Sequence, residues 1–273
     1  MMLLDHNLNI FDIFDQVRDR VLAMVDVLKT SCLLLDDKDE SVVKMHYIVR
    51  DAAISIAEDE KGYLVKHDIE RWPEKGRYEH YSAISLRFTA NIHEFPNELE
   101  CRGLHTLVLK CSNHLPTDFP NNFFKGMENN LEVLDLSEMP IKSLPSSLLT
   151  LVKLWMLCLN GGQLITDIAL LGSLGNLEIL NLQDMEMGPF DDEDGMEFYE
   201  LQFLKSQPQI LPNFFSNLCE LRVGNCQFKF LFTHSIARGL KRLQRLEIED
   251  CQDMEEIIRN ERQGDEKEII FHH

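Results

Sequence analysis

The sequence predicts an α/β fold in which short parallel strands stack into a curved solenoid. Two observations support this: the pattern L-x-x-L-x-L recurs, and its copies are regularly spaced. Clear copies begin at Leu104, Leu131, Leu154 and Leu177, and looser copies begin at Tyr81, Leu218 and Leu243. Successive copies start 23, 27, 23, 23, 41 and 25 residues apart. Most of these steps lie in the range of about 20–29 residues that is typical of leucine-rich repeats.

Each repeat places two apolar side chains of a short strand toward the interior, and one repeat cannot bury them alone. Stacked repeats bury them together behind a parallel β-sheet, which forms the concave wall of a horseshoe. The sequence therefore predicts roughly seven leucine-rich repeats across residues 81–273. Cys226 and Cys251 close the last two copies of the pattern, and we expect them to be buried thiols.

The long step between two of the repeats contains an irregular acidic insertion, near residues 187–215, with four consecutive carboxylates at residues 191–194. It is either a solvated loop or an irregular repeat that bends the solenoid. Its carboxylates lack the spacing of a calcium-binding loop. We therefore expect no metal site.

Composition excludes several classes of function. The 273 residues include 27 Lys and Arg against 46 Asp and Glu, a formal net charge of −19. Phosphate backbones repel such a chain, so we expect no nucleic-acid partner. The seven cysteines are odd in number and contain no C-x-x-C pair, which favours free thiols and a cytoplasmic location. We expect no signal peptide, and no integral membrane segment because no stretch of 18 apolar residues occurs.

The residues before the repeats have a different pattern. Apolar residues recur every three or four positions over 9–29, which predicts an amphipathic helix. Two short apolar runs flank a charged turn near 36–41 and predict a β-hairpin, and a second helix is expected at about 46–57. We expect its buried side to carry Ile48, Val49, Ala52, Ala53 and Ile56. Helix, hairpin and helix is the plan of a winged-helix fragment, but the acidic hairpin tip disfavours DNA binding.

Two segments resemble plant coiled-coil-type NBS-LRR disease-resistance proteins. The run VKMHYIVRDAAISIA (43–57), preceded by RVLAMVDVLKTSCLLLDD (20–37), resembles the end of their NB-ARC module. The run FTHSIARGLKRLQRLEIEDCQDMEEII (232–258) resembles their late repeats. The resemblance implies a partial winged-helix segment of the NB-ARC module at 1–62, a linker at 63–80 and leucine-rich repeats from 81 onward.

In that family, the winged helix ends in a Met-His-Asp motif whose histidine contacts the phosphates of bound ADP. The matching residues are Met45, His46 and Tyr47, so Tyr47 replaces the aspartate that helps to hold the resting form. His46 is the implied ADP contact in full-length relatives, which are ATP/ADP switches. The chain has no G-x-x-x-x-G-K-[S/T] loop to hold phosphates. We therefore expect no enzymatic activity and no cofactor for this chain alone, where His46 can equally be a structural polar residue.

Strand alternation predicts which side chains form the binding surface. Residues between the leucines of each repeat face the concave side of the sheet. The candidate protein-binding residues are Asp135, Met156, Asn160, Ile179, Asn181, Gln183, Arg222, Arg245, Glu247 and Glu249. The middle of this wall mixes apolar and amide side chains, which suits protein recognition. The C-terminal end is acidic on balance, so we expect it to attract a basic partner surface.

The leading prediction is therefore a fragment of an intracellular plant immune receptor. The resemblance implies repeats that recognise proteins and autoinhibit a nucleotide switch that is missing from this chain. The implied partners are an NB-ARC module and a pathogen effector or guarded host protein. The alternative is a stand-alone leucine-rich-repeat adaptor or decoy that binds proteins in trans.

Overall fold

The chain forms two compact units, Met1–Lys61 and Gly62–His273. The structure is a computed structural model. It describes residues 10–38, 42–73, 78–89, 95–111, 119–139, 141, 143–161, 171–184, 215–226 and 230–259.

The first unit contains two helices joined by a short hairpin. Helix α1 (Ile10–Thr30) leads into β1 (Leu35–Asp36), which pairs antiparallel with β2 (Val43–Lys44), and α2 (Tyr47–Lys61) follows. The order confirms the predicted helix, hairpin and second helix. The assignment of this unit to a winged helix stays a prediction.

The expectation that α2 buries an apolar side is wrong. None of its residues is buried, and Ile48 and Ile56 are 59% and 53% exposed. The hairpin strands have only two residues each, too few to cover a helix face. On α1, Val17 and Val21 are likewise about half exposed. No helix in the described residues is both long enough and apolar enough to cross a membrane.

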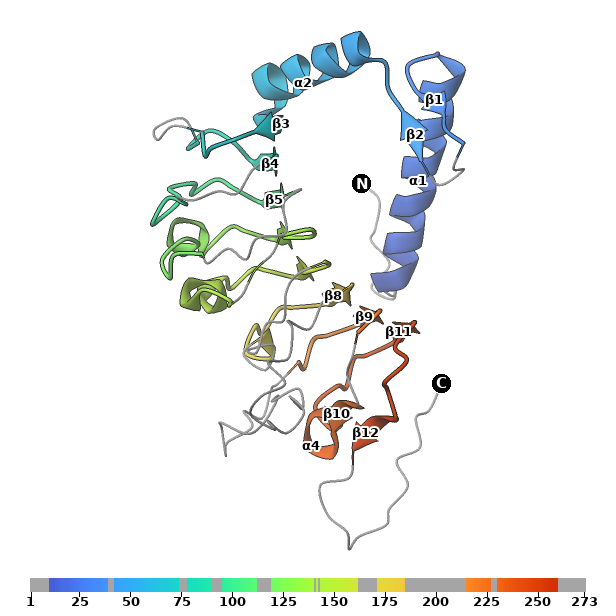
Figure 1. The fold of residues 1–273 in the computed structure, drawn as a ribbon, viewed down its shortest axis with the longest axis vertical. Helices are drawn as coiled ribbons and strands as arrows, with labels where there is room; N and C mark the ends of the chain where they lie inside the picture. The colour runs from blue at the N-terminus through green and yellow to red at the C-terminus, as the bar shows by residue number, and fades with distance from the viewer. Residues whose placement is uncertain are drawn as a thin grey trace, which may run out of the picture. The chain divides into compact units, whose positions relative to one another are not determined.

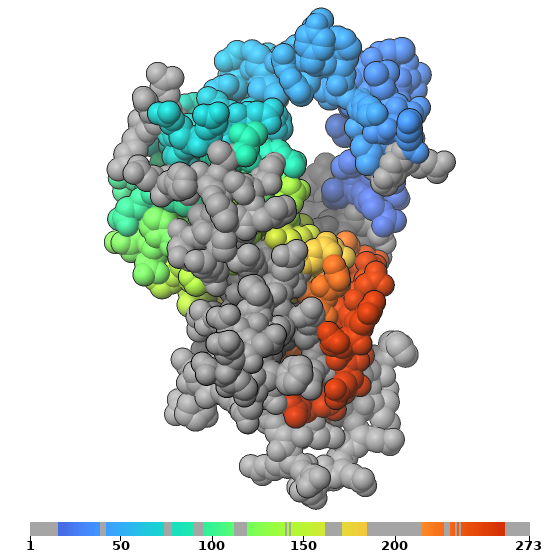
Figure 2. All heavy atoms as spheres, viewed as in Figure 1, coloured from blue at the N-terminus to red at the C-terminus, as the bar shows by residue number. Residues whose placement is uncertain are grey.

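The second unit is a parallel solenoid, as predicted. Within the described residues, its main sheet has eight strands in the order β11-β9-β8-β7-β6-β5-β4-β3. Figure 1 shows the strands following one another along one side of the unit, and Figure 2 shows the colours passing in the same sequence order. The strands are β3 (Tyr63–Ile69), β4 (Ala83–Phe88), β5 (Thr106–Cys111), β6 (Val133–Asp135), β7 (Met156–Cys158), β8 (Ile179–Gln183), β9 (Glu220–Gly224) and β11 (Arg245–Glu249).

A repeating backbone contact fixes the stacking of these strands. Just before each strand, one carbonyl accepts two N–H groups of the following repeat. The carbonyl of Trp155, for example, accepts from Glu178 at 2.8 Å and Ile179 at 2.9 Å. The same double contact is made by the carbonyls of Gly62, Ser82, His105, Glu132, Glu178 and Cys219. The leucines between these contacts form one continuous core, in which Leu107, Leu134 and Leu157 have no exposed surface.

The solenoid begins earlier than predicted, because residues 63–69 form a strand rather than part of a linker. Tyr63 of β3 pairs in parallel register with Ala83 of β4, and Leu64 is 3% exposed. Farther along the expected linker, the Trp72 ring lies 5.8 Å from Phe88 and 5.6 Å from Phe123. The sequence pattern missed this repeat because it supplies one leucine where later repeats supply three.

The 41-residue step does not interrupt the sheet. Strand β8 pairs with β9 over five register positions, from Ile179 opposite Glu220 to Gln183 opposite Gly224. The acidic insertion itself, residues 187–214, lies outside the described part of the chain. The strands on either side of it are therefore stacked as neighbouring repeats.

The far side of the solenoid is built from short elements. They include the 3-10 helices η1 (Lys125–Met127) and η2 (Ser146–Thr150), which bury Met127 and Leu148. In the last two repeats, β10 (Phe230–Thr233) and β12 (Glu256–Arg259) form a second parallel pair, and α4 (His234–Ala237) follows β10. The guanidinium of Arg259 lies 5.0 Å from the centre of the Phe230 ring.

Asparagines connect neighbouring repeats along one edge. Each precedes the first leucine of its repeat and donates its side-chain amide to a carbonyl of the repeat before. The contacts are Asn130 with Arg102, Asn176 with Val152 at 2.5 Å and Asn217 with Gly175 at 2.6 Å.

A left-handed residue ends five of the strand segments. It stands four residues after the central leucine and has φ between 49° and 69° at Glu138, Gly161, Asp184, Asn225 and Asp250. Glycine, asparagine and aspartate tolerate this backbone conformation best. Glu138 is the exception, and its carboxylate forms ion pairs with Arg87 and Lys110.

Removal of the Leu64 side chain tests whether β3 belongs to the core. We expect Leu64→Ala to lower the free energy of unfolding by about 2–5 kcal/mol, the usual cost of emptying a buried leucine site. The exposed neighbour Lys66 gives the control, because Lys66→Ala should change the free energy of unfolding by less than about 0.5 kcal/mol. Both values come from urea denaturation. Equal stability of the two variants would mean that residues 63–69 are a linker after all.

Candidate protein-binding surface

The pleat of the parallel strands aligns the predicted binding residues in rows. We call the sheet face that carries the residues between the leucines the concave wall. From β5 to β11, its second row places one side chain of each strand abreast: Val108, Asp135, Cys158, Asn181, Arg222 and Glu247. The first row runs through Val133, Met156, Ile179, Glu220 and Arg245. The structure thus brings the residues predicted from strand alternation onto one surface.

Part of this wall is more enclosed than expected. Ile179, predicted as an exposed contact, is only 8% exposed, and so is Cys158. Ile179 lies on a central strand, in register between Met156 of β7 and Glu220 of β9. It is therefore part of the floor of the wall, whereas Met156, Asn181 and Arg222 are partly exposed.

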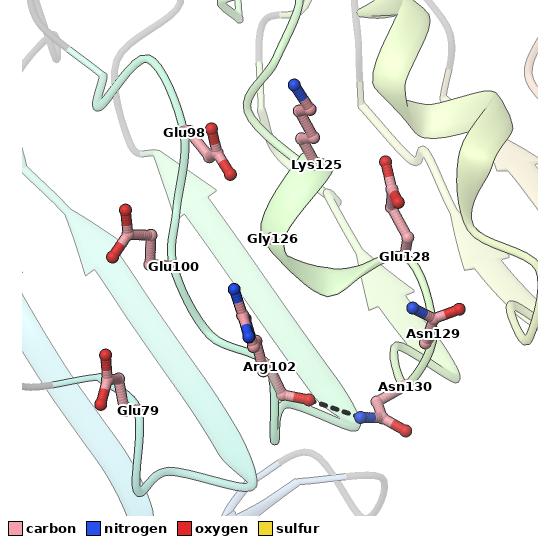
Figure 3. Close-up of a pocket in the computed structure, with 9 residues that line it drawn as sticks. All are labelled: Glu79, Glu98, Glu100, Arg102, Lys125, Gly126, Glu128, Asn129 and Asn130. Carbon is pink, nitrogen blue, oxygen red and sulfur yellow. Dashed lines mark hydrogen bonds between the residues drawn. The ribbon is translucent and has the colours of Figure 1, made fainter.

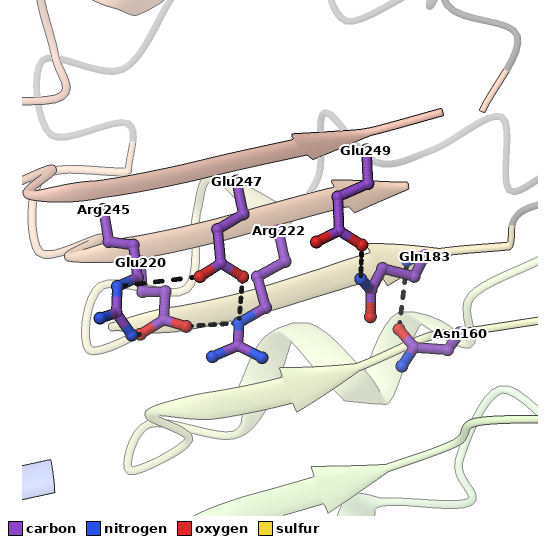
Figure 4. Close-up of polar contacts among 7 residues, drawn as sticks. All are labelled: Asn160, Gln183, Glu220, Arg222, Arg245, Glu247 and Glu249. Atoms are coloured by element: carbon purple, nitrogen blue, oxygen red, sulfur yellow. Dashed lines mark hydrogen bonds and ion pairs between the residues drawn. The ribbon is translucent and has the colours of Figure 1, made fainter. Parts of the chain in front are cut away.

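The C-terminal end of the wall holds a network of ion pairs. The side chain of Glu220 is 5% exposed, and one carboxylate oxygen lies 2.5 Å from Nε of Arg222. The same Nε lies 3.1 Å from Glu247. Arg245 is 3.9 Å from both carboxylates. Figure 4 shows the two arginines interleaved with the two glutamates across adjacent strands.

The C-terminal end of the wall stays acidic on balance, with three glutamates against two arginines, but two of the three carboxylates are ion-paired. Glu220 and Glu247 are balanced by Arg222 and Arg245, so the carboxylates are not free to attract a basic partner. Burial alone would lower the pKa of Arg222, but its hydrogen bond to Glu220 and the charges of Glu220 and Glu247 raise that pKa above its ordinary value. Glu249 stands apart from the network and accepts a hydrogen bond from Gln183 at 3.5 Å.

Amide side chains occupy the middle of the wall. Oδ1 of Asn160 accepts the backbone N–H of Gln183 at 3.2 Å, which ties two neighbouring repeats together (Figure 4). Oδ1 of Asn181 is buried without a hydrogen-bond donor among the described residues. The side-chain oxygen of Asn181, beside Arg222 in the second row, could therefore accept a hydrogen bond from a partner.

At the N-terminal end, the left-handed Glu138 bridges two cations. Its carboxylate lies 3.0 Å from Arg87 and 3.5 Å from Lys110, which belong to the two strands before it. The candidate residues predicted from the sequence include neither Glu138 nor its two partners. The signal was present, since a glutamate stands where the other repeats have glycine, asparagine or aspartate.

His46 lies in the first unit and caps a helix. It is exposed and precedes α2, and its Nδ1 accepts the backbone N–H of Ile48 at 3.3 Å. A side-chain acceptor at this position satisfies one of the free N–H groups of the first helical turn. The imidazole thus has a structural role, and the ADP contact implied by the resemblance stays a prediction.

A groove of about 790 Å³ lies along the edge at which the early strands begin. Figure 3 shows its charged side chains coming from successive turns. They are Glu79, Glu98, Glu100, Arg102, Lys125 and Glu128. Gly126 lines its floor, where an added Cβ would collide with the carbonyl oxygen of Leu99. In the described residues, no three His, Cys, Asp or Glu side chains are placed to hold a metal ion.

The seven cysteines all lie within the described residues and are free thiols. Cys226 is buried as predicted, and its thiol lies 3.1 Å from the carbonyl oxygen of Leu182, whereas Cys251 is only partly buried. Burial and the charge of Asp135 raise the pKa of Cys158 to about 11. Burial and the charge of Glu79 raise that of Cys101 to about 12.

Removal of Arg222 should destabilise the fold more than removal of its partner. Arg222→Ala leaves the buried Glu220 carboxylate with only the distant Arg245, which we expect to cost about 3 kcal/mol. Glu220→Ala leaves Arg222 paired with Glu247 and should cost about 1 kcal/mol. Urea denaturation of both variants measures the difference, and the opposite ranking would contradict the geometry of the network.

The raised pKa of Cys158 predicts a loss of stability at alkaline pH. The folded chain keeps this proton up to a pKa of about 11, whereas the unfolded thiol loses it near its ordinary 9.0. The folded state therefore binds more protons between these values, and stability falls as pH rises through them. We expect the urea midpoint to fall less between pH 8 and pH 10.5 in Cys158→Ala than in the unsubstituted protein. Equal falls would mean that Cys158 titrates normally.

Comparisons with known proteins agree with this architecture. Residues 194–272 match the family of leucine-rich repeats of plant disease resistance proteins that are RPS2-like. Over 167 residues the chain is 29% identical to the probable disease resistance protein At4g27220 of Arabidopsis thaliana, which covers 59% of this chain and 18% of that protein. Over 146 residues it is 33% identical to disease resistance protein RFL1 of the same plant. This match covers 50% of this chain and 16% of that protein.

The chain thus spans less than a fifth of the length of these two relatives. A solved leucine-rich-repeat protein of Leptospira interrogans is 19% identical with a TM-score of 0.38, over 62% of this chain and 43% of that one. The family match and the plant relatives agree with the resemblance: residues 194–272 are similar to the leucine-rich repeats of plant disease resistance proteins, and the wider chain is similar to parts of two such proteins.

Proposed function

We propose that the concave wall is a protein-recognition surface that acts in plant immunity by binding rather than by catalysis. The observation that carries this proposal is the set of partly exposed side chains on the wall from β6 to β11, which combines the apolar Met156, the amide of Asn181 and charged residues such as Asp135 and Arg222. Such a mixture is typical of protein interfaces, which combine an apolar centre with a polar rim. A rigid parallel sheet also holds these side chains in fixed positions before a partner arrives, which lowers the entropic cost of binding.

The wall has two partners in this proposal. One is the nucleotide-binding module of a full-length receptor, which the repeats restrain in its resting state. The other is a pathogen effector or the host protein that it modifies. Any contact with ADP or ATP belongs to that module and to His46 in a full-length context. The free thiols support a reducing, cytoplasmic location for these interactions.

Binding to the remainder of a relative tests the proposal. The chain is mixed with At4g27220 protein that lacks the matched segment, and the dissociation constant is measured by calorimetry. Met156→Arg places a long charged side chain on the wall, and we expect it to weaken binding at least tenfold. Val152→Arg is the control, because Val152 lies on a turn outside the strands and is 58% exposed.

The control variant should bind within twofold of the unsubstituted chain. Equal binding by both variants would place the contact outside the concave wall. No binding by the unsubstituted chain would contradict the restraint of a nucleotide module.

A further inference from the structure

Two charged side chains in the second row of the concave wall have unused binding capacity. Asp135 accepts the backbone N–H of Ser137 at 2.9 Å and forms no ion pair within the described residues. Arg222 uses its Nε for both Glu220 and Glu247, at 2.5 and 3.1 Å. Its two terminal nitrogens form no hydrogen bond in the described part of the chain, and in Figure 4 both marked contacts of Arg222 end on Nε.

The register of the sheet fixes the separation of these two charges. Asp135 is opposite Cys158, Cys158 is opposite Asn181, and Asn181 is opposite Arg222. Neighbouring strands lie about 4.8 Å apart, so three steps separate the two row positions by about 14 Å. The side chains between them are uncharged, and Met156 and Ile179 of the first row lie beside them.

A partner that covers this row must supply a charge at each end. Binding removes water from Asp135 and Arg222, and a charge that is buried without a partner strongly opposes association. Asp135 therefore requires a cation. Arg222 is already fixed by two carboxylates, and its terminal nitrogens form the planar fork that matches a third.

The spacing matches one face of an extended peptide. Side chains at i, i+2 and i+4 of a strand point to the same side, and four residues span about 13 to 14 Å. We propose that the second row binds an extended protein segment with a basic side chain over Asp135, an acidic side chain over Arg222 and an apolar side chain between them. This inference rests on the proposed protein-recognition function and adds the chemistry of the partner.

A displayed hairpin library provides the probe. One face of a stable β-hairpin is randomised at positions i, i+2 and i+4 and selected against the full 273-residue chain. We expect selected hairpins to carry opposite charges at i and i+4, in either order, with an apolar residue at i+2. Asp135→Asn and Arg222→Gln should each raise the dissociation constant at least tenfold. The control is Lys153→Gln, because Lys153 lies on an exposed turn outside the strands, and it should change the dissociation constant less than twofold.

The outcomes separate this inference from the function on which it rests. Hairpins that lose binding to Met156→Arg but carry no opposite charges, or tolerate Asp135→Asn, would overturn the inference and leave the binding wall intact. Selection of no hairpin that responds to Met156→Arg would overturn both. Circular dichroism shows whether Arg222→Gln unfolds the chain. Asp135→Asn leaves no buried charge unpaired, so the Asp135→Asn result still decides between the outcomes if Arg222→Gln does unfold it.

Discussion

The need of each repeat to bury its leucines against its neighbours determines the rest of this structure. A single strand of three to seven residues cannot cover its own apolar side, so the eight strands form one continuous core. The carbonyl before each strand binds two N–H groups of the next repeat, which sets the register. Because the register is fixed, side chains from residues far apart in sequence stand abreast on the concave wall.

That alignment explains the electrostatics of the wall. The chain carries a net charge of −19, yet the buried Glu220 is paired with arginines of its own strand and of the next one. A buried carboxylate is tolerated only when such partners compensate for its lost hydration. The arginines are thereby held in place, and the part of Arg222 that remains available is its planar fork. The wall is therefore suited to recognising a partner through individual polar groups held in fixed positions, more than through its net charge.

The left-handed turns show how a local constraint can reveal a side-chain role. Four of the five residues at this position are of types that adopt positive φ easily. Glu138 adopts it although glutamate does so less readily, and its carboxylate joins cations from the two preceding strands. The ion pairs extend across three repeats, so they reinforce the same stacking that the leucines drive.

The sequence by itself determined the repeat architecture, the position of the strands and the residues that share the concave wall. Leucine spacing carries that information because side chains alternate along a strand. It did not reveal β3, whose Leu64 is buried in the core that it shares with later repeats. Only the tertiary structure decided that Ile179 is buried, that the Glu220 carboxylate is ion-paired with Arg222, and that Asp135 and Arg222 stand about 14 Å apart. These properties arise between strands 23 or more residues apart, where pairing and not local pattern sets the neighbours.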